Sequence, residues 1–246
     1  MDNRKWKKKE YFDNGKLQFE GEYINEKRWK GKGYNYEGKE EFEIKYGQGN
    51  VKEYNYKGKL IFEGEYLNGI RNGKGKEYNN ESFYKFEGEY LNGNKINGKG
   101  YDKKNLLTLE IKNGKRKEYF YNGKLKFEGE HLNERKWNGI GYDYKGIKVF
   151  EIKDGKGKIR EYNYYGTLLF QGEYVNGLKN GNNEEYYINS NLKYIGKFKN
   201  NLKNGKFIEF HYNDKESFVG EYKKGKKTKM QESIMKMVFY YLREIF

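Results

Sequence analysis

The chain carries few side chains that could support catalysis or bind a metal ion. It contains two histidines, His131 and His211, and no cysteine, so disulfides and thiolate metal sites are excluded. Neither histidine has a second ligand or an orienting partner at a spacing typical of zinc sites or catalytic pairs. His131 stands where sibling segments have tyrosine, and His211 stands between Phe210 and Tyr212. We therefore expect a protein that is not an enzyme and that holds neither metal nor cofactor.

Glutamate and glycine are abundant, but they recur at regular intervals and do not gather into one site. The glutamates return once per repeated segment, which is typical of a solvated strand face or a ladder of ion pairs. Gly73 and Gly75 form one of several Gly-x-Gly stretches, yet these lack the strand–loop–helix context of a dinucleotide site. The Gly-Lys pairs lack the spacing and the following Ser or Thr of a phosphate-binding loop. The sequence thus predicts no nucleotide site.

The repeated segment reads FEGEYLNGIRNGKGKEY in its clearest copy, which begins at Phe62. In a strand, Phe62, Gly64 and Tyr66 would point to one face and the residues between them to the other. Asn68 and Gly69 begin a turn, because both tolerate positive φ at little cost. A second glycine-containing strand completes the segment. Each copy is therefore predicted to form one β-hairpin.

The glycine in the third position of this pattern can be followed along the chain as an anchor. In three further copies isoleucine takes its place, at Ile44, Ile111 and Ile152. Successive anchors are separated by roughly 20 residues, a period that indicates a repeat architecture. Asn113-Gly114 and Asp154-Gly155 in the compact isoleucine copies are strong two-residue hairpin signals. The glycine anchors, which we expect to be structural, are Gly21, Gly64, Gly88, Gly129, Gly172, Gly196 and Gly220.

A longer period lies above the hairpin repeat. YFDNGKLQFEG, which begins at Tyr11, aligns with YFYNGKLKFEG, which begins at Tyr119. At the same offset more than half of the residues from 19 to 66 are identical, and Trp29 falls on Trp137. Duplication of a block of about five hairpins explains this agreement.

These motifs resemble the MORN (membrane occupation and recognition nexus) repeat family. The family pattern is roughly aromatic-x-Gly-x-aromatic-x-x-Gly-x-x-x-Gly-x-Gly, and the copy that begins at Phe62 matches it fully through Gly75. The copy that begins at Phe86 matches it with one inserted residue. Tyrosine replaces the family's commonest tryptophan, and three copies lack the first glycine. The resemblance covers about residues 11–222 and implies a non-catalytic repeat protein.

We accordingly expect an all-β fold, an elongated twisted antiparallel meander of about ten stacked hairpins in a single solenoid-like sheet. The connections are too short for crossover helices, which favours antiparallel neighbours. Residues 1–10 would form a basic N-terminal arm, residues 11–226 the repeat array, and residues 227–246 a short amphipathic capping helix.

Composition agrees with a thin sheet and excludes several classes of protein. Hydrophobic residues make up only 35% of the chain, but it has 27 Tyr and 16 Phe, which suits hairpins that bury rings against their neighbours. No apolar run is long enough for a membrane-spanning helix, and the N-terminus lacks the apolar stretch of a signal peptide. An intracellular, cytoplasmic location is expected, with association to the cytoskeleton or a membrane as further alternatives.

Charge is concentrated at the two ends. The chain has a net charge of +15, of which residues 1–9 and 221–246 carry +4 each. The array itself is only mildly basic, so a long groove for nucleic acid is not expected. The basic ends could bind acidic phospholipids such as phosphoinositides, through Arg4, Lys5, Lys7, Lys8, Lys9, Lys223, Lys224, Lys226, Lys227 and Lys229.

The leading hypothesis is a scaffold that presents an aromatic-lined sheet face to a protein partner. Aromatic side chains offer large contacts at low entropic cost. Because the resemblance is to MORN proteins, it implies a role in cytoskeletal, ciliary or membrane-associated assemblies. A homodimer is an alternative arrangement. The candidate contact residues are Phe19, Tyr23, Phe62, Tyr66, Phe86, Tyr90, Phe127, Phe170 and Tyr174.

The C-terminal segment changes pattern. Apolar residues from Met230 to Ile245 recur at helical spacing, which predicts an amphipathic helix that covers the last hairpin. The alternatives are a contact with a partner or a second copy, or with a membrane surface.

Overall fold

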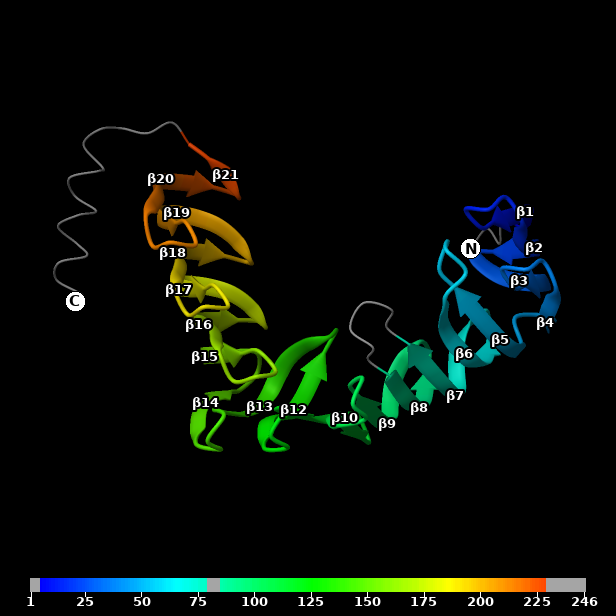
Figure 1. Cartoon of the computed structure of the whole chain (residues 1–246), viewed down its shortest axis with the longest axis horizontal. Coiled ribbons are helices and arrows are strands. Elements are labelled where there is room, and N and C mark those ends of the chain that lie inside the picture. Colours follow the sequence, from blue (N-terminus) through cyan, green and yellow to red (C-terminus); the bar gives the residue numbers. More distant parts are fainter. Residues whose placement is uncertain (1–4, 79–84, 229–246) are drawn as a thin grey trace. The chain divides into compact units, whose positions relative to one another are not determined.

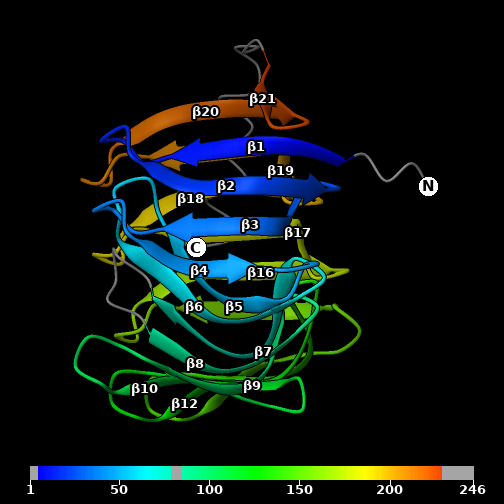
Figure 2. The same cartoon turned by 90° about the vertical axis from the view of Figure 1, so that its right-hand side faces the viewer.

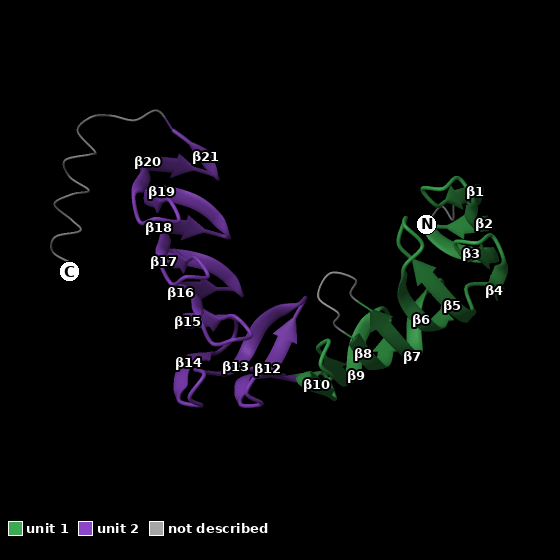
Figure 3. Ribbon diagram, in the orientation of Figure 1, with its two compact units in different colours: residues 1–115 green, residues 116–246 purple. Residues whose placement is uncertain are grey.

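The computed structural model describes residues 5–78 and 85–228, and within these residues all regular elements are β-strands. Residues 1–115 and 116–246 form two compact units (Figure 3). In each unit every described strand pairing is antiparallel and joins strands that follow one another along the chain. The prediction of an all-β fold built from antiparallel hairpins is confirmed.

The first unit contains strands β1 to β10, in which successive strands lie side by side within their sheets (Figure 1). The alternation of polar and apolar residues accounts for them, since it lets one face of each strand be buried. Their bounds are β1 Lys5–Tyr11, β2 Leu17–Ile24, β3 Lys27–Tyr34, β4 Glu40–Ile44, β5 Gly49–Tyr54, β6 Leu60–Leu67, β7 Ile70–Tyr78, β8 Lys85–Leu91, β9 Asn94–Tyr101 and β10 Leu107–Lys112.

Within the second unit, strands β12 to β17 repeat the lengths of β2 to β7. Strand β11, Lys115–Tyr119, begins at the boundary between the units. The remaining strands are β12 Leu125–Leu132, β13 Arg135–Tyr142, β14 Lys148–Ile152, β15 Gly157–Tyr162, β16 Leu168–Val175, β17 Leu178–Tyr186, β18 Leu192–Lys199, β19 Leu202–Phe210, β20 Glu216–Lys223 and β21 Lys226–Lys227.

The strands fall into three sheets, so the expectation of a single sheet is wrong. Strands β1 to β4 form the first sheet, β5 to β14 the second, and β15 to β21 the third. Figure 2 shows β1 to β4 as neighbouring strands of one sheet. The breaks lie between β4 and β5 and between β14 and β15, which are both isoleucine-containing hairpins.

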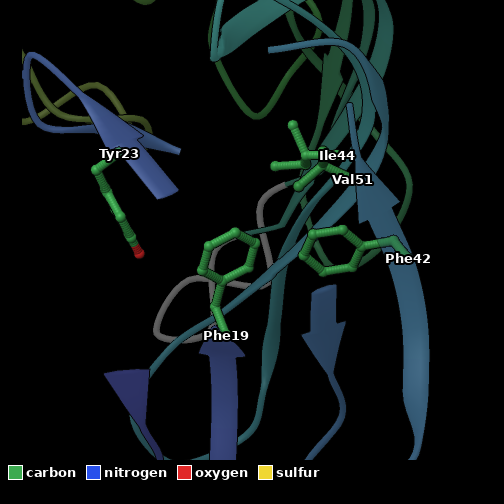
Figure 4. Close-up of a cluster of buried hydrophobic side chains, with 5 residues drawn as sticks. All are labelled: Phe19, Tyr23, Phe42, Ile44 and Val51. Carbon is green, nitrogen blue, oxygen red and sulfur yellow. The ribbon is translucent and has the colours of Figure 1, made fainter. Parts of the chain in front are cut away.

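Each break coincides with two buried branched side chains. Between β4 and β5 a single bridge joins Lys45 and Gln48, and beside it Ile44 and Val51 are 0% and 1% exposed. Figure 4 shows both side chains in the same cluster as Phe42. The hydrogen-bond ladder between β4 and β5 thus ends after one bridge, beside these two buried side chains.

The same arrangement recurs in the second copy of the duplicated block. Strands β14 and β15 are also joined by a single bridge, and Ile152 and Ile159 are buried beside it. The third isoleucine anchor, Ile111, lies within the ten-stranded sheet. On the strand that follows it the sequence has Glu118, where the other two copies have a branched apolar residue. Two such residues are therefore present at both breaks.

The hairpin turns take the conformation that their sequences indicate. Asn68 and Gly69 have φ angles of 53° and 72°, and Asp154 and Gly155 have angles of 49° and 68°. Positive φ at both central residues is the signature of the type I′ turn, which matches the twist of the flanking strands. Successive turns are also linked, since the amide of Gly69 donates to the carbonyl of Gly47 at 2.9 Å.

The N-terminal residues differ from the predicted basic arm. Residues 5–11 form edge strand β1, which pairs with β2. Lys9 forms an ion pair with Glu20 at 3.2 Å, and Trp6 stacks on Tyr23 with 6.1 Å between ring centroids. These cross-strand contacts explain why a lysine-rich segment joins the sheet. Lysines along an exposed edge also discourage pairing with another chain.

The predicted C-terminal helix lies almost wholly outside the described residues. Of its span, 227–246, the structure describes only Lys227 and Thr228, and Lys227 belongs to strand β21. No helix occurs in residues 5–78 and 85–228. The helix and its capping role stay predictions.

Candidate interaction surfaces

Hairpin β6–β7 packs a phenylalanine ring between backbone glycines and a cation. The ring of Phe62 packs against Gly64 and Gly75, so that a Cβ on either glycine would lie 2.7–2.8 Å from ring carbons. On the same ring, the guanidinium of Arg71 lies 4.1 Å from the centroid. Glycine on one side therefore gives the ring room, and the cation covers it with a favourable cation–π contact.

A carboxylate completes this stack. Glu53 accepts hydrogen bonds from Arg71 Nε and Nη2 at 2.8 and 2.9 Å, and also from the hydroxyl of Tyr66. Burial alone would raise the pKa of Glu53, but the bonds from Arg71 and Tyr66 outweigh it and the pKa lies below its ordinary value. Burial and the charge of Glu53 raise the pKa of Tyr66. At neutral pH, Glu53 and Arg71 therefore stay charged and Tyr66 stays neutral.

The cation–ring contact recurs along both units, with arginine at two places and lysine at others. In the first unit it joins Arg28 to Phe19 and Lys95 to Phe86. In the second unit it joins Lys136 to Phe127 and Lys179 to Phe170. The carboxylate partners of these cations are Glu10, Glu77, Glu161 and Glu185. A single residue pattern thus builds the core of successive hairpins.

Because of this packing, the aromatic residues that were predicted to contact a partner belong to the core. Phe19, Phe62 and Phe86 are fully buried, as are Phe127 and Phe170 to within 2%. Tyr23 and Tyr90 are buried too, while Tyr66 and Tyr174 are half-buried. A partner approaching this face would meet the covering cations and carboxylates before it met the phenylalanine rings.

Several exposed aromatic side chains lie instead in turns, whereas Trp6 and Tyr11 are exposed on strand β1. Tyr46, Tyr56, Tyr165 and Tyr212 are 55–66% exposed. Each belongs to a connection between strands, and three of them stand one or two residues before a turn glycine. That position relative to glycine is the sequence signal that could have identified them, because turn residues project away from the sheet.

The opposite face of the first unit carries a charged groove of about 600 Å³. It crosses strands β4 to β8, and its lining side chains alternate along the strands with the buried ones. Gly64, Gly75 and Gly88 contribute backbone to it. Its charged lining consists of Glu41, Glu63, Glu65, Glu87, Glu89, Lys52, Lys74 and Lys76. Five carboxylates face three lysines, which leaves the groove with two excess negative charges.

Cross-strand ion pairs connect side chains of the groove but leave its excess of negative charge. Lys76 lies 3.3 Å from Glu87, and Lys52 lies 3.4 Å from Glu41. Burial alone would raise the pKa of Glu41, but the hydroxyl of Tyr54 and the charge of Lys52 hold it below its ordinary value. Glu41 therefore stays ionised at neutral pH.

The predicted anchor glycines lie where strands approach most closely. A Cβ on Gly64 would lie 2.5 Å from the carbonyl oxygen of Lys74 and 2.6 Å from the Cα of Gly75. Gly21, Gly88 and Gly129 face a neighbouring strand in the same way. The remaining anchors would place a Cβ against side chains, at Gly172, Gly196 and Gly220.

The predicted lipid-contact residues are partly engaged within the protein. Lys5, Lys7, Lys8 and Lys9 are exposed on edge strand β1. Lys227 lies 3.1 Å from Glu209 and 3.9 Å from the centroid of the Phe218 ring. Lys223, Lys224 and Lys226 are exposed, whereas Arg4 and Lys229 lie outside the described residues.

The histidines do not form a metal site in the described part of the chain, which contains no cluster of three metal-ligating side chains. His131 packs edge-on against Phe127 with 5.4 Å between ring centroids, as expected for a residue in an aromatic position. Burial, reinforced by Arg116, lowers the pKa of His131 to about 4. The ring is therefore neutral at physiological pH.

Among the described residues there is no helix long and apolar enough to cross a membrane. No model of a protein family matches this sequence, and no curated protein is found to match it.

Proposed function

We propose that the protein is a non-catalytic MORN-repeat scaffold that binds a protein partner, in a cytoskeletal, ciliary or membrane-associated assembly. The observation that carries this proposal is the anionic groove across strands β4 to β8. The groove presents charges at the spacing of neighbouring strands, which suits an extended polypeptide better than a compact substrate. The repeat motifs support the family assignment.

The partner we infer is an extended segment rich in Lys and Arg. Glu63 and Glu65 stand on one strand, and Glu87 and Glu89 stand two strands further on. Two excess negative charges favour a basic partner and would steer its approach. Phenylalanine rings beneath the sheet would support the groove and not contact the partner, because they are buried.

The second unit supplies a natural control for this groove. At the offset that places Tyr11 on Tyr119, the second copy has Gln171, Ile195 and Lys197 in place of the first unit's Glu63, Glu87 and Glu89. A Glu63→Gln/Glu87→Ile/Glu89→Lys variant therefore removes acidity with side chains that this strand geometry already holds. Glu22→Gln/Glu26→Gln/Glu37→Gln is the comparison variant, since these carboxylates belong to the same unit but do not line the groove.

The test is direct binding of Lys/Arg-rich extended peptides, measured by fluorescence polarisation, together with quantitative capture of partners from native cells. Wild type should bind such peptides with a strong salt dependence. The groove variant should bind at least about tenfold more weakly, which corresponds to about 1.4 kcal/mol, and the comparison variant should resemble wild type. Peptide binding that is unchanged in the groove variant, or native capture without a stoichiometric partner, would count against the proposal.

A second proposed function is peripheral binding to acidic phospholipids. The observation that favours it is the exposure of Lys5, Lys7 and Lys9 along the open edge of β1. Each such charge near an anionic leaflet contributes about 1 kcal/mol. Flotation with vesicles that contain phosphatidylserine or a phosphoinositide should depend on these lysines and on anionic lipid. If flotation persists after Lys5, Lys7 and Lys9 are replaced by alanine, strand β1 does not mediate lipid binding.

A further inference from the structure

A small cavity of about 230 Å³ lies in the second unit, where strands β14 and β15 diverge. Its lining comes from strands β12 to β16, on both sides of the break between sheets. Lys126, Lys136, Arg160, Glu161 and Tyr162 supply the polar lining, and phenylalanine and leucine side chains supply the rest. The cavity is therefore a charged site bordered by apolar side chains.

Its charges are unbalanced. Lys136 lies 3.4 Å from Glu161 and 5.3 Å from the centroid of the Phe127 ring. In the part of the chain that the structure describes, neither Lys126 nor Arg160 forms an ion pair. Three cations thus share one lining carboxylate, and the cavity carries two excess positive charges.

The first unit shows how the same position looks when its charges are balanced. There Gln18 stands in place of Lys126, and its Nε2 donates to the carbonyl of Tyr54 at 2.8 Å. Lys52, in the place of Arg160, lies 3.4 Å from Glu41. The hydroxyl of Tyr54 also donates to Glu41.

Two substitutions between the copies create the positive cavity. Lys126 replaces Gln18, which adds a cation, and Val149 replaces Glu41, which removes the carboxylate. Val149 packs against the neighbouring apolar cluster and leaves Arg160 without the partner that Lys52 has. Burial lowers the pKa of Lys126, although the charge of Glu118 opposes this shift. Lys126 is half-buried and Arg160 is exposed at the mouth of the cavity. A partly buried cation without an ion pair lowers stability, and a bound anion would supply the missing partner.

We propose that this cavity binds a phosphate group, either free phosphate or the head of a phosphate monoester. Two excess positive charges complement a phosphate group, which carries about 1.5 to 2 negative charges at pH 7. Arginine and lysine are the side chains that bind its oxygens. The volume also exceeds the roughly 30 Å³ that one water occupies several times over, so the apolar walls leave room for part of an ester. This site lies in the other unit from the anionic groove and does not depend on the proposed scaffold function.

The first copy suggests the test variants. Lys126→Gln and Val149→Glu each restore the residue that the first unit holds at that position, so both are compatible with the local fold. Lys145→Gln is the matched control, because Lys145 is an exposed lysine in the same region that does not line the cavity. The probes are inorganic phosphate and phenyl phosphate, titrated by calorimetry at constant ionic strength against chloride.

Wild type and Lys145→Gln should bind phosphate with one site per chain. Lys126→Gln should weaken binding at least about tenfold, and Lys126→Gln/Val149→Glu should abolish it while raising the ligand-free melting temperature. Stronger binding of phenyl phosphate identifies a monoester as the ligand type, and equal binding identifies the phosphate group alone. Absence of binding in wild type, or equal binding by the double variant and wild type, overturns the proposal.

Discussion

Arg71 holds Glu53 with two parallel hydrogen bonds while its guanidinium covers the ring of Phe62. Arg71 Nη1 also donates to Glu77 at 2.8 Å. A single side chain therefore joins two carboxylates from different strands and closes the core beneath them. Lys95, one repeat further on, forms an ion pair with Glu77 at 2.7 Å, but an ammonium lacks the planar fork with which a guanidinium holds a carboxylate.

Replacing Arg71 by Met should lower the free energy of unfolding by about 2–4 kcal/mol, because Glu53 would stay half-buried without its charged partner. Denaturant unfolding followed by circular dichroism measures the change. Lys148→Ala is the control, since Lys148 and Glu151 are about half exposed and such pairs contribute about 0–1 kcal/mol. Equal losses in the two variants would contradict the role assigned to Arg71.

Gly129→Ala should destabilise the second unit by more than about 2 kcal/mol. The new Cβ would lie 2.7 Å from the Cα of Gly139 and 2.9 Å from the ring of Phe127, and the backbone cannot move aside without opening the hairpin. Gly123→Ala meets no atom within 4 Å but has a φ of +76°, so its cost should be only about 1 kcal/mol. Thermal unfolding of the two variants should rank them in this order.

His131 should make stability depend on pH between about 4 and 6.5. Its pKa falls from 6.5 to about 4 on folding, so in this range the unfolded chain binds a proton that the folded chain does not, and stability falls as pH falls. With solvent screening taken into account, the free energy of unfolding should fall by about 1–3 kcal/mol across this pH range. Stability should then change no further through this group below pH 4.

The matched variant is His131→Tyr, which copies Tyr23 of the first unit. It should remove the contribution of His131 in this pH window, because tyrosine does not titrate there. It also replaces His131 Nδ1, which is buried without a hydrogen-bond partner among the described residues. Urea unfolding at several pH values compares the two proteins, and parallel profiles would show that His131 is not the source.

Ile152→Ala should cost about 2–4 kcal/mol and loosen the break between β14 and β15. The side chain is 1% exposed and packs with Phe150 and Ile159, so truncation leaves a cavity in a core that cannot easily collapse. Ile147→Ala is the control, because Ile147 is 59% exposed and should change stability by less than about 0.5 kcal/mol. Hydrogen exchange at β15 reports the local effect.

Much of the fold could be predicted from the sequence because its signals are local. Asn-Gly and Asp-Gly pairs specify type I′ turns through the φ angles they tolerate. The spacing of Phe62, Gly64 and Tyr66 specifies which side chains share a strand face. These are properties of a few consecutive residues, so hairpin number and strand direction follow without knowledge of the remainder of the chain.

The candidate surfaces could be predicted less well from such local signals. Phe62 and Phe86 are natural candidates for contact residues, since an aromatic face is apparent in the pattern. Whether the rings are displayed or covered depends on Arg71 and Lys95, which are contributed by the following strand and lie over them. The pattern specifies the face, but the covering side chain is a tertiary contact between strands.

The hairpin unit, its turns, its antiparallel order and the long internal duplication can all be established from the order of residues alone. Folding adds the sheet breaks at Ile44 with Val51 and at Ile152 with Ile159, and it brings Lys126 and Arg160 to one cavity. Turn geometry and strand alternation depend on neighbours in sequence, which is why they can be recognised without a structure. Strand divergence and charge balance depend instead on volumes and charges that meet only when distant segments pack together.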